Sequence, residues 1–321
     1  MSKKFIIGID IGGTKIAAVL ATTSGEILQR VSEATDADKR DSNAVLKRLA
    51  EMAREVVAVG NAEHSEILGV GISCGGPLDN ETGVILSPPN LPEWKSVPVK
   101  AFIEKALELP VRVENDANAT ALAEWRYGAG KGTKNLIFLT IGTGIGGGLI
   151  LDGHLYRGTN NLAGEVGHQT ILMNGPLCGC GKRGCLEALA SGPAIARLAR
   201  ESMMYGRHKR VLALAGGVPK NITAAHVIES AKQGDPFGVQ VLEEAGTYLG
   251  VGIANLIQLF NPEMIVLGTI AVHAGDLILN PIRAAVKEYA WERSAAVCKI
   301  VPAALGDRAQ DLAAVALWSE M

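Results

Sequence analysis

Three of the five cysteines, Cys178, Cys180 and Cys185, lie within eight residues, and His168 precedes the first of them by ten. Three thiolates and one imidazole make a complete ligand set for a tetrahedral structural zinc site. Glycines between the cysteines let the backbone turn tightly enough to direct the sulfurs to one point. The pattern therefore predicts zinc, and scattered buried thiols are the less favoured alternative.

Two acidic residues, Glu165 and Glu187, flank these ligands in the sequence. A zinc finger that only stabilises a fold has no need of such acids. We therefore expect the metal to fix polar groups around a small molecule, with zinc supporting both acids.

A glycine-rich turn joins two apolar, strand-like segments, residues 5–10 and 16–21, and contains Asp10, Gly12, Gly13, Thr14 and Lys15. Phosphate oxygens need close backbone donors, which glycine allows. The threonine adds a hydroxyl and the lysine a positive charge, and the aspartate can organise Mg²⁺, usually through water. An ordinary hairpin turn is the alternative.

A second such turn, residues 142–148, follows the apolar segment 136–141. It matches the pattern G-x-G-x-x-G, which indicates a dinucleotide site only when a helix follows. Here a short apolar segment and the turn Asp152-Gly153 follow, and no Gly-Lys-Ser/Thr closes the loop. We predict a β-hairpin phosphate loop with Thr143 and Gly144. Two such hairpins suggest a duplicated domain whose hairpins face each other across a cleft.

Asp116 follows the predicted strand 111–114 and begins a predicted helix. Strand ends are where α/β proteins place ligand groups, and a carboxylate there can accept the proton of an attacking sugar hydroxyl. Helix capping by Asp116 or Asn118 is the alternative. The two phosphate turns and the zinc pattern favour a catalytic base.

A glycine–proline loop at residues 73–79 and the segment 88–92 could line a pocket wall. Gly76 would contribute backbone there, and Asn90 could both donate hydrogen bonds to hydroxyls and accept them. A purely structural turn is equally favoured for this region.

Elsewhere, periodicity predicts helices and strands in mixture, which indicates a layered α/β architecture. The predicted helices are 42–59, 99–107, 116–127, 236–260, 281–289 and 309–318, and the further strands are 68–73, 264–267 and 299–302. Residues 202–220 are the expected irregular insertion. We place the smaller domain at residues 1–116 with 307–321, and the larger, zinc-carrying domain at 117–306.

The composition is that of a soluble protein: 321 residues, 48% hydrophobic, 20% charged and a formal net charge of −2. No basic surplus predicts nucleic-acid binding, and no apolar segment reaches the length of a membrane span. The first apolar segment breaks at Asp10, so we expect no signal peptide. Clustered, odd-numbered cysteines do not form a disulfide framework, and we expect a reducing cytoplasm.

Together these motifs resemble the ROK family of bacterial sugar kinases over nearly the whole chain. The matching pieces are Asp10-x-Gly12-x-Thr14, Gly75–Pro77, Glu114-Asn115-Asp116-Ala117-Asn118, residues 142–148, Glu165-x-x-His168 and the cysteine segment through Glu187. The resemblance implies the two-lobed, actin-like (ribonuclease H-like) fold with a ligand cleft between its lobes, as a homodimer or homotetramer. It implies transfer of the γ-phosphoryl of MgATP to a hexose, and the motif set is most similar to that of the glucokinases.

Carried over residue by residue, the resemblance implies Asp116 as catalytic base and His168, Cys178, Cys180 and Cys185 as zinc ligands. Sugar contacts fall to Asn90, Asn115, Asp116, Glu165, His168 and Glu187, and phosphate contacts to Gly12, Thr14, Lys15, Thr143 and Gly144. The family usually has a glycine pair near the adenine, where this chain has Gly268 followed by Thr269. Thr269 adds a β-carbon and a methyl group where the backbone should pass close to the nucleotide, so the affinity for the nucleotide and the preference among nucleosides are expected to differ from those of the family.

Three alternatives stay open. The hexose could be N-acetylmannosamine, fructose, mannose or allose in place of glucose, because these sugars differ at positions set in three dimensions. A sugar-responsive transcription regulator of the family would carry an added DNA-binding domain, which we do not expect because the first hairpin begins at Phe5. A non-catalytic sugar-binding protein is disfavoured by the intact Asp116.

Overall fold

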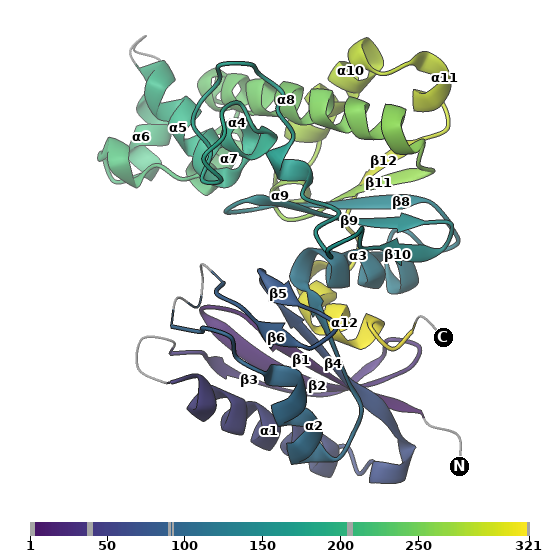
Figure 1. Ribbon diagram of the computed structural model, residues 1–321. Helices are drawn as coiled ribbons and strands as arrows, with labels where there is room; N and C mark the ends of the chain where they lie inside the picture. The colour runs from purple at the N-terminus through teal and green to yellow at the C-terminus, as the bar shows by residue number, and fades with distance from the viewer. Residues whose placement is uncertain (1–3, 37–40, 89–90, 92, 204–207, 320–321) are drawn as a thin grey trace. The chain divides into compact units, whose positions relative to one another are not determined.

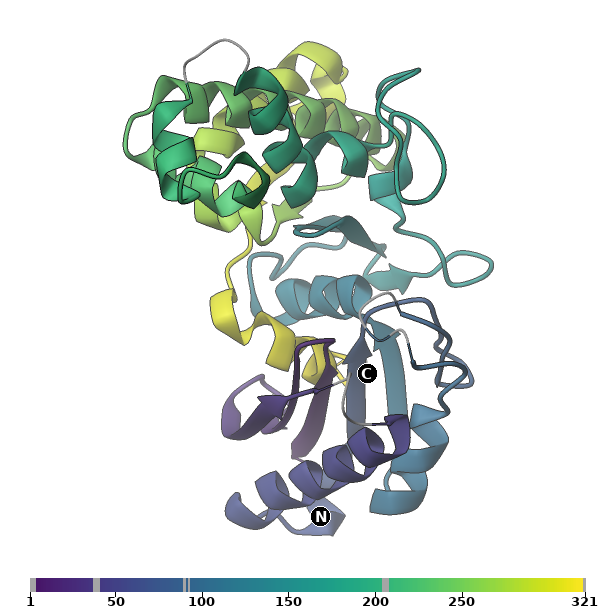
Figure 2. The ribbon, with the colours of Figure 1, turned by 90° about the vertical axis from the view of Figure 1, so that its left-hand side faces the viewer.

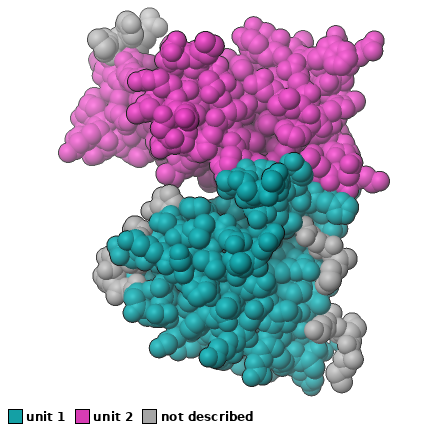
Figure 3. Space-filling view, in the orientation of Figure 1, with its two compact units in different colours: residues 1–132, 154–163, 304–321 teal, residues 133–153, 164–303 magenta. Residues whose placement is uncertain are grey.

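The computed structural model describes residues 4–36, 41–88, 91, 93–203 and 208–319. By packing, the chain divides into two compact units, shown in different colours in Figure 3. Unit 1 comprises residues 1–132, 154–163 and 304–321, and unit 2 comprises 133–153 and 164–303. The domain boundary near residues 115–118 stays a prediction. No helix in the described ranges is long and apolar enough to span a membrane.

Unit 1 is a sheet covered by helices on both faces (Figures 1 and 2). The strands of this sheet are β1 (Phe5–Ile11), β2 (Lys15–Thr22), β3 (Ile27–Ala34), β4 (Ile67–Cys74) and β7 (Val111–Asn115). Strands β5 (Leu78–Asp79) and β6 (Val84–Ile85) form a separate two-stranded sheet, and the short strand β10 (His154–Tyr156) also falls among the residues of unit 1. Its helices are α1 (Ser42–Val59), α2 (Val99–Leu107), α3 (Asp116–Tyr127) and α12 (Ala309–Ala316), with short 3₁₀ turns η1 (His64–Glu66) and η5 (Gly306–Arg308). Helices α1 and α2 lie on one face of the sheet, and α3 and α12 on the other.

Local sequence explains where these helices begin and which face they bury. The side chain of Asp41 caps α1 by accepting the Ala44 amide at 2.7 Å. The apolar residues of α1 recur at helical spacing, so one stripe, including Leu46, Leu49 and Val56, is buried against the sheet. That burial is the main source of the helix's stability.

Unit 2 has its helices α4, α5, α7, α8 and α10 gathered on one side of its sheet (Figure 1). Its strands are β8 (Leu136–Ile141), β9 (Ile145–Leu151), β11 (Met264–Leu267) and β12 (Lys299–Pro302). Its helices are α4 (Leu186–Ala190), α5 (Gly192–Ser202), α6 (Lys209–Leu214), α7 (Ala224–Lys232), α8 (Pro236–Phe260), α9 (Ile270–Ala274), α10 (Asp276–Tyr289) and α11 (Glu292–Ala295), with 3₁₀ turns η2 (Val166–His168) and η4 (Pro219–Asn221).

The two units repeat one topology. In unit 1 the strands run in the order β3-β2-β1-β4-β7, and in unit 2 the order β9-β8-β11-β12 follows the same plan from its hairpin onward. Each hairpin is antiparallel, and each first hairpin strand has a parallel neighbour on its other side. This arrangement agrees with the duplication that the glycine turns suggest.

Several predicted elements need correction. The second glycine turn covers only residues 142–144, because β9 begins at Ile145 and Gly146 pairs with Thr140 inside the ladder. Helix α10 begins at Asp276 and not at the predicted Pro281, which lies inside the helix and packs closely against Gly246 of α8. The segment 202–220 contains α6. The elements without a counterpart in the sequence prediction are β3, β5, β6, β10, α4, α5, α7, α9 and α11.

Candidate active site

In unit 1, the candidate residues lie at the carboxyl ends of three parallel strands. The register pairs Asp10 of β1 with Ser73 of β4, and Cys74 of β4 with Asn115 of β7. The hairpin turn, the glycine–proline loop and the start of α3 therefore follow neighbouring strand ends. Open α/β sheets bind ligands at this edge.

Asn115, not Asp116, is the cap of α3. Its side-chain oxygen accepts the amides of Ala117 at 2.9 Å and Asn118 at 3.3 Å. Asp116 is the first helical residue and belongs to the exposed residues, and its carboxylate accepts the Ala117 amide at 2.8 Å. The capping alternative for Asp116 thus loses its basis, because the helix already has a cap.

Two opposing effects act on the pKa of Asp116. Burial of the surrounding region raises the pKa of Asp116, and the hydrogen bond from the Ala117 amide opposes that rise. The residue as a whole is nevertheless exposed. A raised pKa makes the Asp116 carboxylate a stronger base toward the proton of a hydroxyl group.

Gly76 lies directly beside the amide group of Asn115. A side-chain carbon at position 76 would stand 3.1 Å from Asn115 Nδ2, so the missing side chain leaves that amide accessible. The Asn115 oxygen is occupied by capping, which leaves its nitrogen as the group available to a ligand. Asn90 lies outside the described residues.

The turn between β1 and β2 is held by backbone and by one buried hydroxyl. The Gly12 amide donates to the Lys15 carbonyl at 3.0 Å, and Thr35 Oγ1 donates to the Gly12 carbonyl at 2.6 Å. The side chains of Thr14 and Lys15 are exposed at the tip, next to Gly13. A fixed turn with free donors at its tip suits an anion.

Asp10 carries the largest acidic perturbation of this turn. Burial, followed by the nearby carboxylates of Asp311 and Asp116, raises its pKa to about 7. Lys15 and Arg30 lower it but do not cancel the rise. A carboxylate crowded in this way gains from a bound cation, which fits the predicted role near Mg²⁺.

At this edge of the sheet, Glu114 is a buried carboxylate that pairs with Arg157, a partner that the sequence motifs do not predict. It accepts Arg157 Nε at 2.7 Å, Asn118 Nδ2 at 3.2 Å and the Asn115 amide at 3.0 Å. Arg157 lies 43 residues away in sequence. No local spacing signal could have found this pair, which fixes the residues on either side of Asp116.

In unit 2, the glycine turn is tied to Glu187 of α4. Glu187 Oε2 accepts the Ile145 amide at 2.9 Å, and a side-chain carbon on Gly144 would lie 2.5 Å from the same oxygen. The Gly192 amide donates to the Gly142 carbonyl at 2.8 Å, while Thr143 is exposed at the tip. The carboxylate of Glu187, a predicted sugar ligand, therefore also holds the predicted phosphate turn in place.

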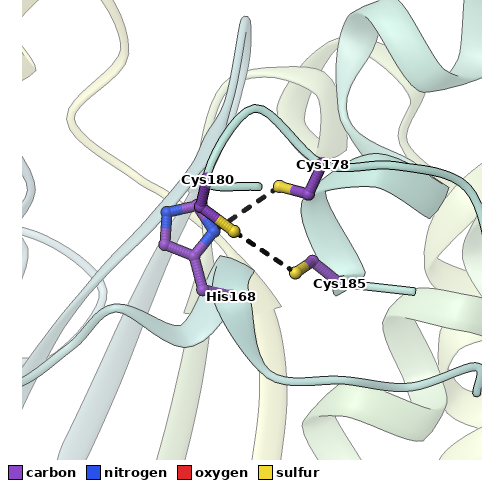
Figure 4. Close-up of side chains that lie close together, drawn as sticks. All are labelled: His168, Cys178, Cys180 and Cys185. Atoms are coloured by element: carbon purple, nitrogen blue, oxygen red, sulfur yellow. Dashed lines mark hydrogen bonds between the residues drawn. The ribbon is translucent and has the colours of Figure 1, made fainter. Parts of the chain in front are cut away.

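The predicted zinc ligands lie together in unit 2 (Figure 4). One ligand atom from each of His168, Cys178, Cys180 and Cys185 lies within 4.8 Å of the others. The Cys180 and Cys185 sulfurs are 3.7 Å apart, as are the Cys178 sulfur and His168 Nδ1. Tetrahedral zinc with bonds of about 2.3 Å sets sulfurs about 3.8 Å apart. The donor set and its spacing therefore fit Zn²⁺.

The protonation of these thiols also favours a metal. Burial raises the pKa of Cys178 to about 12 and raises that of Cys185, whereas a hydrogen bond from the Lys182 amide lowers that of Cys180. Thiols with raised pKa values need a cation to become thiolates near neutral pH.

Both flanking acids lie next to this cluster. The Cys178 sulfur is 3.6 Å from Glu187 Oε1, and Glu165 Oε2 is 3.8 Å from His168 Nε2. With Nδ1 facing the sulfurs, Nε2 of His168 is the ring nitrogen left for Glu165 or a ligand.

The predicted nucleotide residue Gly268 follows β11, and its amide donates to the Leu139 carbonyl at 2.8 Å.

Comparison with known proteins gives the class. The ROK family model matches residues 6–321. The chain is 36% identical over 320 residues to a glucokinase of Thermotoga maritima, covering 100% of this chain and 99% of that one. It also matches the crystal structure of a ROK family glucokinase from Streptomyces griseus in complex with glucose and AMPPNP, with a TM-score of 0.80, 35% identity and 98% of both chains covered.

A xylose repressor of Caldicellulosiruptor bescii is 33% identical over 97% of this chain and 77% of its own length. The chain belongs to the ROK family. The predicted α/β, actin-like fold class is confirmed by the match to the solved ROK kinase.

Proposed function

We propose that this ROK-family chain transfers the γ-phosphoryl group of MgATP to a hexose, with the 6-hydroxyl of glucose as the favoured acceptor. The observation that carries the proposal is the position of Asp116: it is an exposed residue directly after the carboxyl end of β7, and Asn115, not Asp116, caps the helix that follows. The glucokinase relatives and the solved relative that binds glucose and AMPPNP support the choice of substrates.

In the proposed reaction, Asp116 accepts the proton of the sugar hydroxyl as its oxygen bonds to the γ-phosphorus. The bond from that phosphorus to the bridging oxygen breaks, and ADP leaves. The tips of the two hairpin turns would hold the phosphates, through Gly12, Gly13, Thr14, Lys15, Thr143 and Gly144, and Gly268 would border the nucleotide. Mg²⁺, organised near Asp10, would offset the phosphate charge.

The sugar would be held by hydroxyl contacts from Gly76, Asn90, Asn115, Glu165, His168 and Glu187, besides Asp116. Zn²⁺, held by His168, Cys178, Cys180 and Cys185, would supply a fixed frame and no chemical step. The frame acts on Glu187 through the 3.6 Å approach of the Cys178 sulfur and on Glu165 through His168.

The direct test is Asp116→Asn, which keeps the size of the side chain and the cap at Asn115. We expect kcat to fall by about 10²–10⁴, the usual contribution of a general base, with glucose and nucleotide affinities unchanged. ADP release is followed by a coupled assay. Asp307→Asn, an exposed acid elsewhere in unit 1, is the matched control and should keep full turnover. Near-full activity in Asp116→Asn removes that residue from the role.

A second candidate function is sugar binding without catalysis, as in a regulator, which the xylose repressor match favours. The two functions separate in the same assay. A kinase releases ADP only when a hexose is present and loses this activity with Asp116→Asn. A binding protein shows sugar affinity by calorimetry and no sugar-dependent ADP release with any of glucose, N-acetylmannosamine, fructose, mannose or allose.

The state of the protein in the cell is part of the proposal. We infer a cytoplasmic homodimer or homotetramer that needs no nucleic acid or membrane. Light scattering coupled to size-exclusion chromatography measures the assembly directly, and a monomer at assay concentration contradicts it.

A further inference from the structure

Thr269 has a backbone conformation that threonine rarely adopts. Its φ is 51° and its ψ is −102°. Asn261 and Glu108 also have positive φ, but their ψ values of 53° and 35° place them in the ordinary left-handed region. Of the described non-glycine residues with positive φ, Thr269 is the one with a branched β-carbon. A glycine would adopt this conformation without strain.

The backbone on both sides holds Thr269 in place. The Gly268 amide donates to the Leu139 carbonyl at 2.8 Å, and the Gly268 carbonyl accepts the Ala271 amide at 3.2 Å. The next residues, Ile270 and Ala271, are buried in the core of unit 2. Thr269 itself is exposed, so burial of its own side chain does not offset the strain. Strain that the core does not explain points to a role for the side chain.

The Thr269 side chain reaches two features at the carboxyl edge of the unit 2 sheet. Its hydroxyl lies 3.2 Å from that of Thr140, near the end of β8. Its methyl group would be 3.9 Å from a side-chain carbon on Gly142, so it lies against the glycine turn. Strands β8 and β11 are parallel neighbours, paired up to Leu139 and Leu267. Both hydroxyls thus follow adjacent strand ends, where ligand groups are expected.

Two hydroxyls in mutual contact share one proton in their bond and keep one to donate. We propose that the Thr140–Thr269 pair donates this hydrogen bond to a phosphate oxygen of the nucleotide held at the Gly142–Gly144 turn. This inference rests on the proposed function, and it makes Thr269 a nucleotide-binding residue in a position whose backbone favours glycine.

Three substitutions at position 269 separate the hydroxyl, the methyl and the strain. Thr269→Val keeps the branched carbon and removes the hydroxyl, so the Kd for ADP measured by calorimetry should rise about tenfold, as expected for a lost hydrogen bond to a charged group. Thr269→Ser keeps the hydroxyl and should stay within about twofold of the wild type. Thr269→Gly should lose ADP affinity like valine while raising Tm by a few degrees through relief of strain.

Thr140→Val tests whether the two hydroxyls act as a unit. Its ADP affinity should fall as in Thr269→Val, and the double variant should be no weaker than either single variant. Glucose affinity, measured on every variant, reports that the rest of the site is intact. If Thr269→Val binds ADP as tightly as the wild type, or if Thr269→Gly shows no increase in Tm, the role of the Thr140–Thr269 pair is refuted and the proposed kinase function still stands. A wild-type protein that binds glucose but no ADP overturns the proposed kinase function together with that role.

Discussion

The two units share a strand order but differ in how their interiors hold polar groups. All three buried carboxylates of the described residues, Glu114, Glu124 and Asp311, lie in unit 1. The buried polar side chains of unit 2 in the described ranges are the two serines Ser191 and Ser230. Unit 2 has instead its histidine–cysteine cluster. The same strand order therefore occurs with buried carboxylates in one unit and with a cluster of possible metal ligands in the other.

The substitution with the largest expected effect removes a buried carboxylate of unit 1. Glu124 is fully buried and accepts the backbone amides of Ala129 at 2.9 Å, Ala304 at 3.0 Å and Leu305 at 3.0 Å. Glu124→Ala leaves these amides without their acceptor, and we expect a loss of about 3–5 kcal/mol in the free energy of unfolding. Urea titration followed by tryptophan fluorescence measures it.

Tryptophan fluorescence reports mainly on the unfolding of unit 1. That unit contains Trp94, Trp125 and Trp318, whereas unit 2 contains Trp291. Glu124→Gln keeps one acceptor oxygen and should cost about half as much. Glu244→Ala, at an exposed position of α8, is the control and should stay within about 0.5 kcal/mol. An alanine variant within about 1 kcal/mol of the wild type contradicts the importance of these buried bonds.

A smaller effect concerns the charge at Asp10. Its pKa is raised to about 7, first by burial and then by Asp311 and Asp116. The folded protein therefore binds a proton on Asp10 that the unfolded chain releases near its ordinary pKa of 3.8. Stability from this group is highest at acid pH and is lost as pH rises toward 7. An asparagine side chain does not titrate and has no such loss, so Asp10→Asn should gain stability over the wild type as pH rises.

Between pH 5.5 and pH 8 this gain should grow by about 2 kcal/mol. The measurement is paired urea titrations of both proteins at each pH, with EDTA present so that no divalent cation neutralises the carboxylate. Asp276→Asn, an exposed acid of unit 2, serves as the pH control. A stability difference that stays constant across this range shows that Asp10 titrates normally.

The contrast between the units also marks what the sequence could predict. The histidine–cysteine cluster, both hairpins and α1 could be predicted from short-range spacing, because cysteines, glycines and a helical apolar stripe are local sequence signals. Strand β3 has no buried residues, and so lacks the kind of apolar run that predicts β1, β4 and β8. The Glu114–Arg157 pair joins segments far apart in sequence, and the strain at Thr269 arises from packing on both sides. Such features depend on tertiary structure.

The third experiment disrupts the histidine–cysteine cluster of unit 2, which we propose binds zinc. Cys180 is the exposed cysteine of the cluster, so Cys180→Ser should disturb the core least. We expect elemental analysis to find one zinc per chain in the wild type and none in the variant. Glucose affinity should fall about 10–100-fold, because Glu187 and His168 lose their fixed positions.

Cys298→Ser is the matched control, since Cys298 is a cysteine of the same unit outside the cluster. It should keep both zinc and glucose affinity. The urea titration, dominated by the tryptophans of unit 1, should be nearly the same for both variants if each unit is fixed by its own device. Unchanged zinc content in Cys180→Ser refutes the ligand assignment, and lost zinc with unchanged glucose affinity shows that the cluster does not position the sugar ligands.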